Sequence, residues 1–200
     1  MILTTLPDER PLILASSSPY RRSLLNRLGL PYKAISPNVD ESPLAGENAK
    51  DTALRLALSK AQAIAKTHPD AFIIGSDQVA ILEGDILGKP HTHANAMIQL
   101  QKMRGKNVIF HTAICLLDAR SKRYSLEDVP TRLLMRDLSD DQLENYLKRE
   151  QPYDCAGSAK SEGLGIALIK EMQGEDPNAL VGLPLIKLVS MLEQHGISVI

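Results

Sequence analysis

The sequence predicts an α/β protein in which helices flank a mixed β-sheet. In the first part of the chain, apolar stretches of strand length alternate with amphipathic stretches of helical period. Further along, strand-like stretches follow one another more closely before helical patterns return. Such an order of elements is typical of a sheet that combines parallel and antiparallel strands. With 200 residues, the chain can build one sizeable core or two closely packed lobes.

The individual elements follow from apolar periodicity and from residues that begin or end helices. The helix predicted after the first strand has Ser18 as its N-cap, Pro19 at its first position and Gly29 as its stop. A hairpin turned at Gly84 and Asp85 is expected to join two short strands, 79–82 and the segment around Ile86. The other strands are expected at 11–16, 32–36, 71–75, 108–117, 125–135 and 164–169. Helices are expected at 19–28, 51–66, 92–103, 139–150 and 184–195.

One helix, predicted over 51–66, has a clear apolar stripe. The stripe consists of Leu54, Leu58, Ala61 and Ala65, and the opposite face, expected in solvent, consists of Arg55, Ser59, Gln62 and Lys66. Lys60 lies at the margin of the stripe. Its ammonium group either extends along the helix surface to solvent or reaches into a cleft.

Composition and charge narrow the function class. The formal net charge is −1 and only 4% of residues are aromatic, which argues against nucleic acid as a partner. No apolar run approaches the ~20 residues that span a bilayer, so we expect no membrane segment. The N-terminus does not resemble a signal peptide, and the two cysteines give no disulfide framework. We therefore expect a cytoplasmic protein with a tail at 1–10 and one catalytic domain at 11–200.

The segment ILASSSPYRR raises a question about charge. Arg21 and Arg22 fall in the first turn of a helix, where the positive end of the helix dipole disfavours cations. A bound anion would remove that penalty, because serine hydroxyls, free N–H groups and guanidinium groups all bind phosphate oxygens. Ser16 belongs to this candidate phosphate cradle. The alternative is that the arginines are solvated and the serines only cap the helix.

Acidic side chains suggest a cation site. Asp77 follows a strongly apolar strand, and Glu41 lies in a loop after another strand. Two carboxylates from separate loops could hold a hard divalent cation, with phosphate oxygens as further ligands. Alternatively, each is an ordinary solvated acid. Lys89, between Gly88 and Pro90, is a further candidate ligand for phosphate.

A set of ordered motifs extends these observations: LILASSSPYRR, VDES, LALSKA, IIGSDQV, LGKP, CAGSAKSEG and LVGLPL. Together, from residue 12 to 192, they resemble the Maf family of nucleoside triphosphate pyrophosphatases. The resemblance implies a mixed α/β fold with two lobes around a cleft, related to the inosine-triphosphate pyrophosphatases. It also implies hydrolysis of a nucleoside triphosphate to the monophosphate and pyrophosphate with a divalent cation, such as Mg²⁺ or Mn²⁺.

The same resemblance assigns expected roles. Asp77 matches the proton acceptor of the family, and Glu41 matches its acidic loop residue. Both are expected to hold the metal. The positions expected to contact phosphate are Ser16, Arg21, Lys60 and Lys89, together with Arg22, which occupies a more variable position of the pattern.

Three positions distinguish the branches of the family. Tyr20, Gln78 and Glu162 match the branch that hydrolyses 7-methyl-GTP, although the aromatic residue there is often tryptophan. N7-methylation makes guanine a cation, which an aromatic face attracts, and a carboxylate can accept the N–H groups of its Watson–Crick edge. Alternatives are a pyrophosphatase for another modified nucleotide or for dTTP and UTP, and a nucleotide-binding regulator of cell division without turnover. The sequence also leaves a homodimer open.

Overall fold

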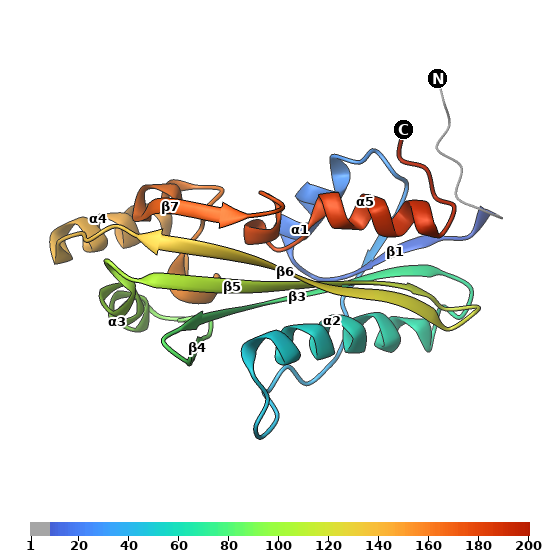
Figure 1. The fold of residues 1–200 in the computed structure, drawn as a ribbon, viewed down its shortest axis with the longest axis horizontal. Helices are drawn as coiled ribbons and strands as arrows, with labels where there is room; N and C mark the ends of the chain where they lie inside the picture. The colour runs from blue at the N-terminus through green and yellow to red at the C-terminus, as the bar shows by residue number, and fades with distance from the viewer. Residues whose placement is uncertain (1–8) are drawn as a thin grey trace. The chain divides into compact units, whose positions relative to one another are not determined.

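The computed structural model describes residues 9–200, which form the expected mixed α/β fold (Figure 1). The sheet has the strand order β2-β1-β3-β5-β6-β7, and β4 pairs with β3. The strands are β1 (Leu12–Ala15), β2 (Lys33–Ile35), β3 (Phe72–Leu82), β4 (Asp85–Leu87), β5 (Asn107–Asp118), β6 (Arg123–Met135) and β7 (Ile169–Gly174). The α-helices are α1 (Pro19–Asn26), α2 (Ala49–Ala65), α3 (His93–Met103), α4 (Asp140–Glu150) and α5 (Leu185–Gln194). Short 3₁₀ helices are η2 (Ala156–Ser158), η3 (Leu164–Leu168) and η4 (Ala179–Val181).

Strand directions confirm the mixed sheet. β1 pairs in parallel with both β2 and β3, whereas β3–β4 and β6–β7 are antiparallel pairs. The chain divides into two compact units. Unit 1 contains the described residues up to Asp77, together with Thr112–Val129 and Asp176–Ile200. Unit 2 contains Gln78–His111 and Pro130–Glu175.

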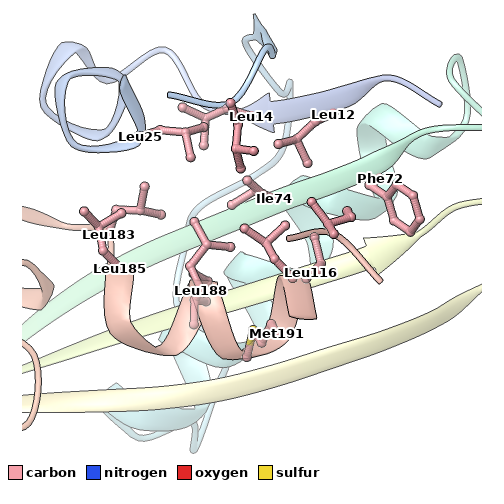
Figure 2. Close-up of a cluster of buried hydrophobic side chains, with 14 of the residues drawn as sticks. Leu12, Leu14, Leu25, Phe72, Ile74, Leu116, Leu183, Leu185, Leu188 and Met191 are labelled. Atoms are coloured by element: carbon pink, nitrogen blue, oxygen red, sulfur yellow. The ribbon is translucent and has the colours of Figure 1, made fainter. Parts of the chain in front are cut away.

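The main core of unit 1 lies between the sheet and two helices (Figure 2). Alternate residues of β1 and β3 point into it, because successive side chains of a strand face opposite sides of the sheet. Helices α1 and α5 cover this side, and the buried cluster includes Leu12, Leu14, Leu25, Phe72, Ile74, Leu116, Leu183, Leu188 and Met191. Within unit 1, α2 lies on the other face of the sheet (Figure 1).

The buried face of α2 differs from the predicted stripe. Leu54 and Leu58 are only half-buried, and the fully buried positions include Ala53, Leu56, Ala57, Lys60, Ala61 and Ile64. The reason is close approach to the sheet: a Cβ added to Gly75 of β3 would lie 2.1 Å from the carbonyl oxygen of Ala57. The small side chains therefore face the sheet, and Lys60 faces it with them.

In unit 2, α3 packs against α4. Their N-caps are predictable from the sequence. Thr92 accepts a hydrogen bond from the backbone of Asn95, and Ser139 forms a capping box with Gln142. Both helices begin where the sequence indicates, because a hydroxyl side chain satisfies backbone N–H groups that have no partner inside the helix.

Two strand predictions were wrong. β3 does not end at residue 75 but continues to Leu82, so Asp77 lies inside a strand rather than after it. Ala15 pairs with Gly75 at the end of the parallel ladder with β1, and Asp77 lies beyond that end. Residues 164–168 form the 3₁₀ helix η3 instead of a strand, and β7 starts only at Ile169.

The β3–β4 hairpin is confirmed, with its turn one residue earlier than predicted. Leu82 pairs with Asp85, which leaves Glu83 and Gly84 as the loop. Both have positive φ angles, 52° and 99°. Such angles at both loop residues match the twist of the flanking strands.

The expected tail at 1–10 lies mostly outside the described residues. Arg10 is described, however, and it is buried within unit 1. Its guanidinium group pairs with Asp118, donates to the carbonyl of Asp70 at 2.9 Å and lies 4.1 Å from the ring centre of Phe72. Among the described residues, every helix is too short or too polar to cross a membrane.

Candidate functional site

A buried lysine lies between two carboxylates in unit 1. The Nζ atom of Lys60 is 2.6 Å from Oδ1 of Asp77 and 2.7 Å from Oε1 of Glu41. Lys60 and Asp77 are largely buried, whereas the Glu41 side chain is 55% exposed. The three charged groups thus converge from helix α2, strand β3 and the loop after β2, and solvent reaches them from the Glu41 side.

Helix packing explains why the lysine is buried. Lys60 follows Ala57 on the face of α2 that contacts β3, and the close approach at Gly75 brings the helix against the strand. A buried ammonium group is stable only when charged partners replace its hydration shell. Asp77, two residues beyond Gly75 on the same strand, supplies one such partner.

A second ion pair holds the loop that carries Glu41. Arg55 of α2 contacts both carboxylate oxygens of Glu47, at 2.7 and 2.8 Å, and donates to the carbonyl of Ser42 at 3.0 Å. Glu47 also accepts from the Thr52 hydroxyl. Because Arg55 hydrogen-bonds strongly to it, the pKa of Glu47 falls to about 2. Ser42 is next to Glu41 in the chain, so this pair fixes the backbone beside the carboxylate.

Arg21 is oriented by a backbone carbonyl. Its Nε donates to the oxygen of Gly182 at 2.7 Å, and the buried hydroxyl of Ser76 donates to the same oxygen at 2.9 Å. Removal of the guanidinium from water lowers the pKa of Arg21, and the charges of Asp77 and Glu41 oppose that shift. Arg21 is thus a fixed cation in the field of the two carboxylates.

The serine segment forms the predicted helix start. Ser18 caps α1 by accepting from the backbone N–H of Arg21, and the buried Ser16 accepts from the N–H of Ser18 at 3.1 Å. Arg22 is exposed and donates to the carbonyl of Ser17 at 2.9 Å. The structure therefore separates the adjacent arginines: one is turned toward Gly182, the other lies on the surface.

The remaining predicted residues divide between the units. Tyr20 is half-buried on α1 in unit 1, whereas Gln78, Lys89 and Glu162 belong to unit 2. Gln78 directly follows Asp77 on β3 and is half-buried. Lys89 is exposed in the loop after β4, and Glu162 is exposed in the turn before η3.

Lys89 lies in an anchored loop. The carbonyl of Gly88 accepts hydrogen bonds from the Gln99 side chain and from the backbone of Gly157. The carbonyl of Pro90 accepts from the Asn95 side chain. With both neighbours held, the backbone at Lys89 is fixed although its side chain is exposed.

The donor set in unit 1 is compatible with a hard divalent cation. The carboxylates of Glu41 and Asp77 already share one positive group, Nζ of Lys60, so their oxygens converge on one position. Carboxylate oxygens are the ligands that Mg²⁺ and Mn²⁺ prefer. Across residues 9–200, three or more acidic, histidine or cysteine side chains nowhere gather into a metal-binding group. A cation here would therefore take its other ligands from substrate oxygens and water.

Sequence reasoning missed several residues of this arrangement. Arg55 was expected in solvent, and no role was assigned to Glu47, Ser76 or the carbonyl of Gly182, although Ser76 and Gly182 lie within the motifs IIGSDQV and LVGLPL. The acceptor at Gly182 belongs to the backbone, which no residue pattern reveals. Arg55 could have been suspected from its spacing, because it lies eight residues after Glu47, on the second turn of α2.

Comparisons with known proteins agree with the sequence pattern. Residues 11–195 match the family described as Maf-like protein. The chain is 60% identical over 190 residues to the 7-methyl-GTP pyrophosphatase of Methylobacillus flagellatus, which covers 95% of this chain and 99% of that one. It is 58% identical over 194 residues to the 7-methyl-GTP pyrophosphatase of Cupriavidus pinatubonensis, with 97% of each chain covered. Among solved structures, the Ham1 protein of Staphylococcus aureus matches with a TM-score of 0.48 and 16% identity, over 64% of this chain and 73% of that one.

Proposed function

Because the chain belongs to the Maf-like protein family, we propose that it is a nucleoside triphosphate pyrophosphatase that hydrolyses 7-methyl-GTP to 7-methyl-GMP and pyrophosphate. The observation that carries this proposal is the 60% identity to a 7-methyl-GTP pyrophosphatase over 99% of that relative's length. The converging carboxylates of Glu41 and Asp77 support it, because they could hold the divalent cation that an anionic triphosphate needs, with Lys60 and Arg21 as nearby positive charges.

In the proposed reaction, Asp77 accepts a proton from water as the water oxygen attacks the α-phosphorus. A new P–O bond forms, the bond from the α-phosphorus to the bridging oxygen breaks, and pyrophosphate leaves with that oxygen. A divalent cation bound by Glu41 and Asp77 would neutralise charge on the triphosphate. Asp77 is buried, so bulk water has little access to its carboxylate. The proton would therefore come from a water molecule positioned beside Asp77 with the substrate.

Lys60 has two successive partners in this scheme. In the structure, its ammonium group is the counter-ion of Glu41 and Asp77. With a divalent cation held by Glu41 and Asp77, the ammonium of Lys60 would be available to the substrate phosphates. Arg21, already oriented by Gly182, supplies a second fixed positive charge. Ser16, Arg22 and Lys89 are the other proposed phosphate contacts.

The proposed specificity depends on Tyr20, Gln78 and Glu162. The ring of Tyr20 would stack on the positively charged methylated base, an attraction worth about 0.5–2 kcal/mol. Glu162 would accept hydrogen bonds from the guanine edge, and its exposed carboxylate is accessible for this. Gln78 both donates and accepts, so it can bond to either kind of group on the base.

The test is pyrophosphate release with Mg²⁺ from 7-methyl-GTP, GTP, UTP, dTTP and ITP, run on the wild type and on Tyr20→Arg. The wild type should prefer 7-methyl-GTP. The variant should lose roughly tenfold of the preference over UTP, because an arginine repels a cationic base and the cation–π attraction is removed. Turnover of another triphosphate would keep the reaction and overturn the substrate, whereas tight binding without turnover would make the protein a regulator.

A further inference from the structure

Glu150 ends helix α4 with a negative charge, where the helix dipole disfavours one. The structure supplies compensation mainly from one loop, in addition to the neighbouring Arg149. Glu150 Oε1 lies 2.7 Å from the ammonium of Lys160, and its Oε2 accepts from the backbone N–H of Leu164 at 2.7 Å. The Glu150 side chain is only 14% exposed. Each carboxylate oxygen therefore has its own partner, and the two partners lie four residues apart in the chain.

The loop between those partners contains Glu162. Lys160 precedes it by two residues and Leu164 follows it by two, so the carboxylate of Glu150 binds a side chain on one side of Glu162 and the backbone on the other. Tyr146, one helical turn earlier on α4, adds a further contact: its hydroxyl accepts from the N–H of Lys160 at 3.1 Å and donates to the carbonyl of Ser158 at 2.9 Å. The loop is thus held against one face of α4.

Two glycines permit this close packing. A Cβ on Gly163 would lie 2.7 Å from Oε2 of Glu150, and a Cβ on Gly165 would lie 2.4 Å from the carbonyl oxygen of Lys160. The hydrogen bonds of Lys160 and Leu164 hold the pKa of Glu150 below its ordinary value. Glu162 itself is exposed, so the loop presents one carboxylate to solvent while another anchors it from beneath.

We propose that Glu150 is a positioning residue for substrate selection, because it fixes the loop on which Glu162 meets the base. The inference rests on the proposed function, in which Glu162 accepts hydrogen bonds from the edge of the guanine base. Glu150 does not contact the substrate in this scheme. It acts through Glu162, by restricting where that carboxylate can lie, and this reduces the conformational cost of binding the base.

Glu150→Gln tests the proposal with nearly unchanged size. A carboxamide offers one oxygen acceptor, so its NH₂ group must face either the ammonium of Lys160 or the N–H of Leu164. We expect KM for 7-methyl-GTP to rise roughly tenfold with little change in kcat, and KM for UTP to change far less. The matched control is Glu144→Gln on the same helix, which removes the negative charge paired with Lys148 and His93 and should keep the selectivity.

A double-mutant cycle with Glu162→Gln distinguishes an effect of Glu150 through Glu162 from a general loss of substrate affinity. If Glu150 acts through Glu162, the double variant should be no less selective than Glu162→Gln alone. Additive losses of selectivity would overturn the proposal. If Glu150→Gln does not fold, Lys160→Met removes the other half of the ion pair and enters the same cycle.

The cycle also separates this inference from the proposed function. Should the wild type prefer a different triphosphate, the substrate assignment fails. The same variants assayed with the preferred triphosphate then decide the inference: non-additivity supports it and additivity contradicts it.

Discussion

At the scale of single residues, Asp77 combines two roles that one substitution separates. It is a counter-ion of Lys60 in the structure and the proton acceptor in the proposed reaction. Asp77→Asn keeps the size and a hydrogen bond to the lysine but cannot accept a proton from water. We expect kcat to fall by about three orders of magnitude or more in a protein that still folds but melts at a lower temperature, because buried Lys60 then keeps only Glu41 as a charged partner. Retained turnover would remove Asp77 from this role, and Asp85→Asn in the exposed hairpin is the matched control.

Glu47 should make the thermal stability of the protein depend on pH in the acidic range. Arg55 lowers its pKa in the folded protein from 4.5 to about 2. A carboxyl group with a depressed folded pKa adds stability above its unfolded pKa, and this contribution disappears as pH falls through the folded value. The difference in melting temperature between wild type and Glu47→Gln should therefore be constant above about pH 5 and shrink toward pH 2. Thermal scans across that range check it, and a pH-independent difference would contradict it.

At the scale of elements, the contact of α2 with β3 depends on Gly75. A Cβ there would lie 2.1 Å from the carbonyl oxygen of Ala57, a backbone atom that only a shift of the helix can move. Gly75→Ala should lower the free energy of unfolding by about 2–3 kcal/mol or more, measured with denaturant. Gly88→Ala, where a Cβ meets nothing within 4 Å, should change it by less than about 0.5 kcal/mol. Equal effects at the two positions would contradict the packing argument.

The same scale shows which elements can be predicted and why. Helix starts at Ser18, Thr92 and Ser139 are correct, because capping is a local interaction between a side chain and nearby backbone groups. The length of β3 and the buried face of α2 were misjudged. Both depend on partners distant in sequence, and the polar residues after Gly75 resemble the end of a strand although the sheet continues through them.

At the scale of the whole molecule, the sequence predicts most of the candidate chemistry but not its supports. The ordered motifs identify Glu41, Lys60 and Asp77 as candidate site residues. The structure places them in direct contact. The groups that hold these side chains in place were not predictable. The carbonyl that orients Arg21 belongs to the backbone of a distant segment. The partner of Glu150 is Lys160, outside its helix, so the sequence around Glu150 gives no reason for its charge. Such supports become visible only when the chain is folded.

The position of Lys60 has a practical consequence for how the protein can be handled. Its ammonium group already compensates the charges of Glu41 and Asp77, so the fold has a cation of its own at this point. Treatment with EDTA should abolish turnover yet change the melting temperature by less than about 2 °C, and Mg²⁺ should restore full activity without refolding. The melting temperature of Lys60→Met should respond differently to EDTA. Without the ammonium group, the carboxylates of Glu41 and Asp77 repel each other until a divalent cation is added. Calorimetry of the wild type and of Lys60→Met, with and without EDTA, measures these melting temperatures. It compares a counter-ion built into the chain with a divalent cation that a chelator can remove.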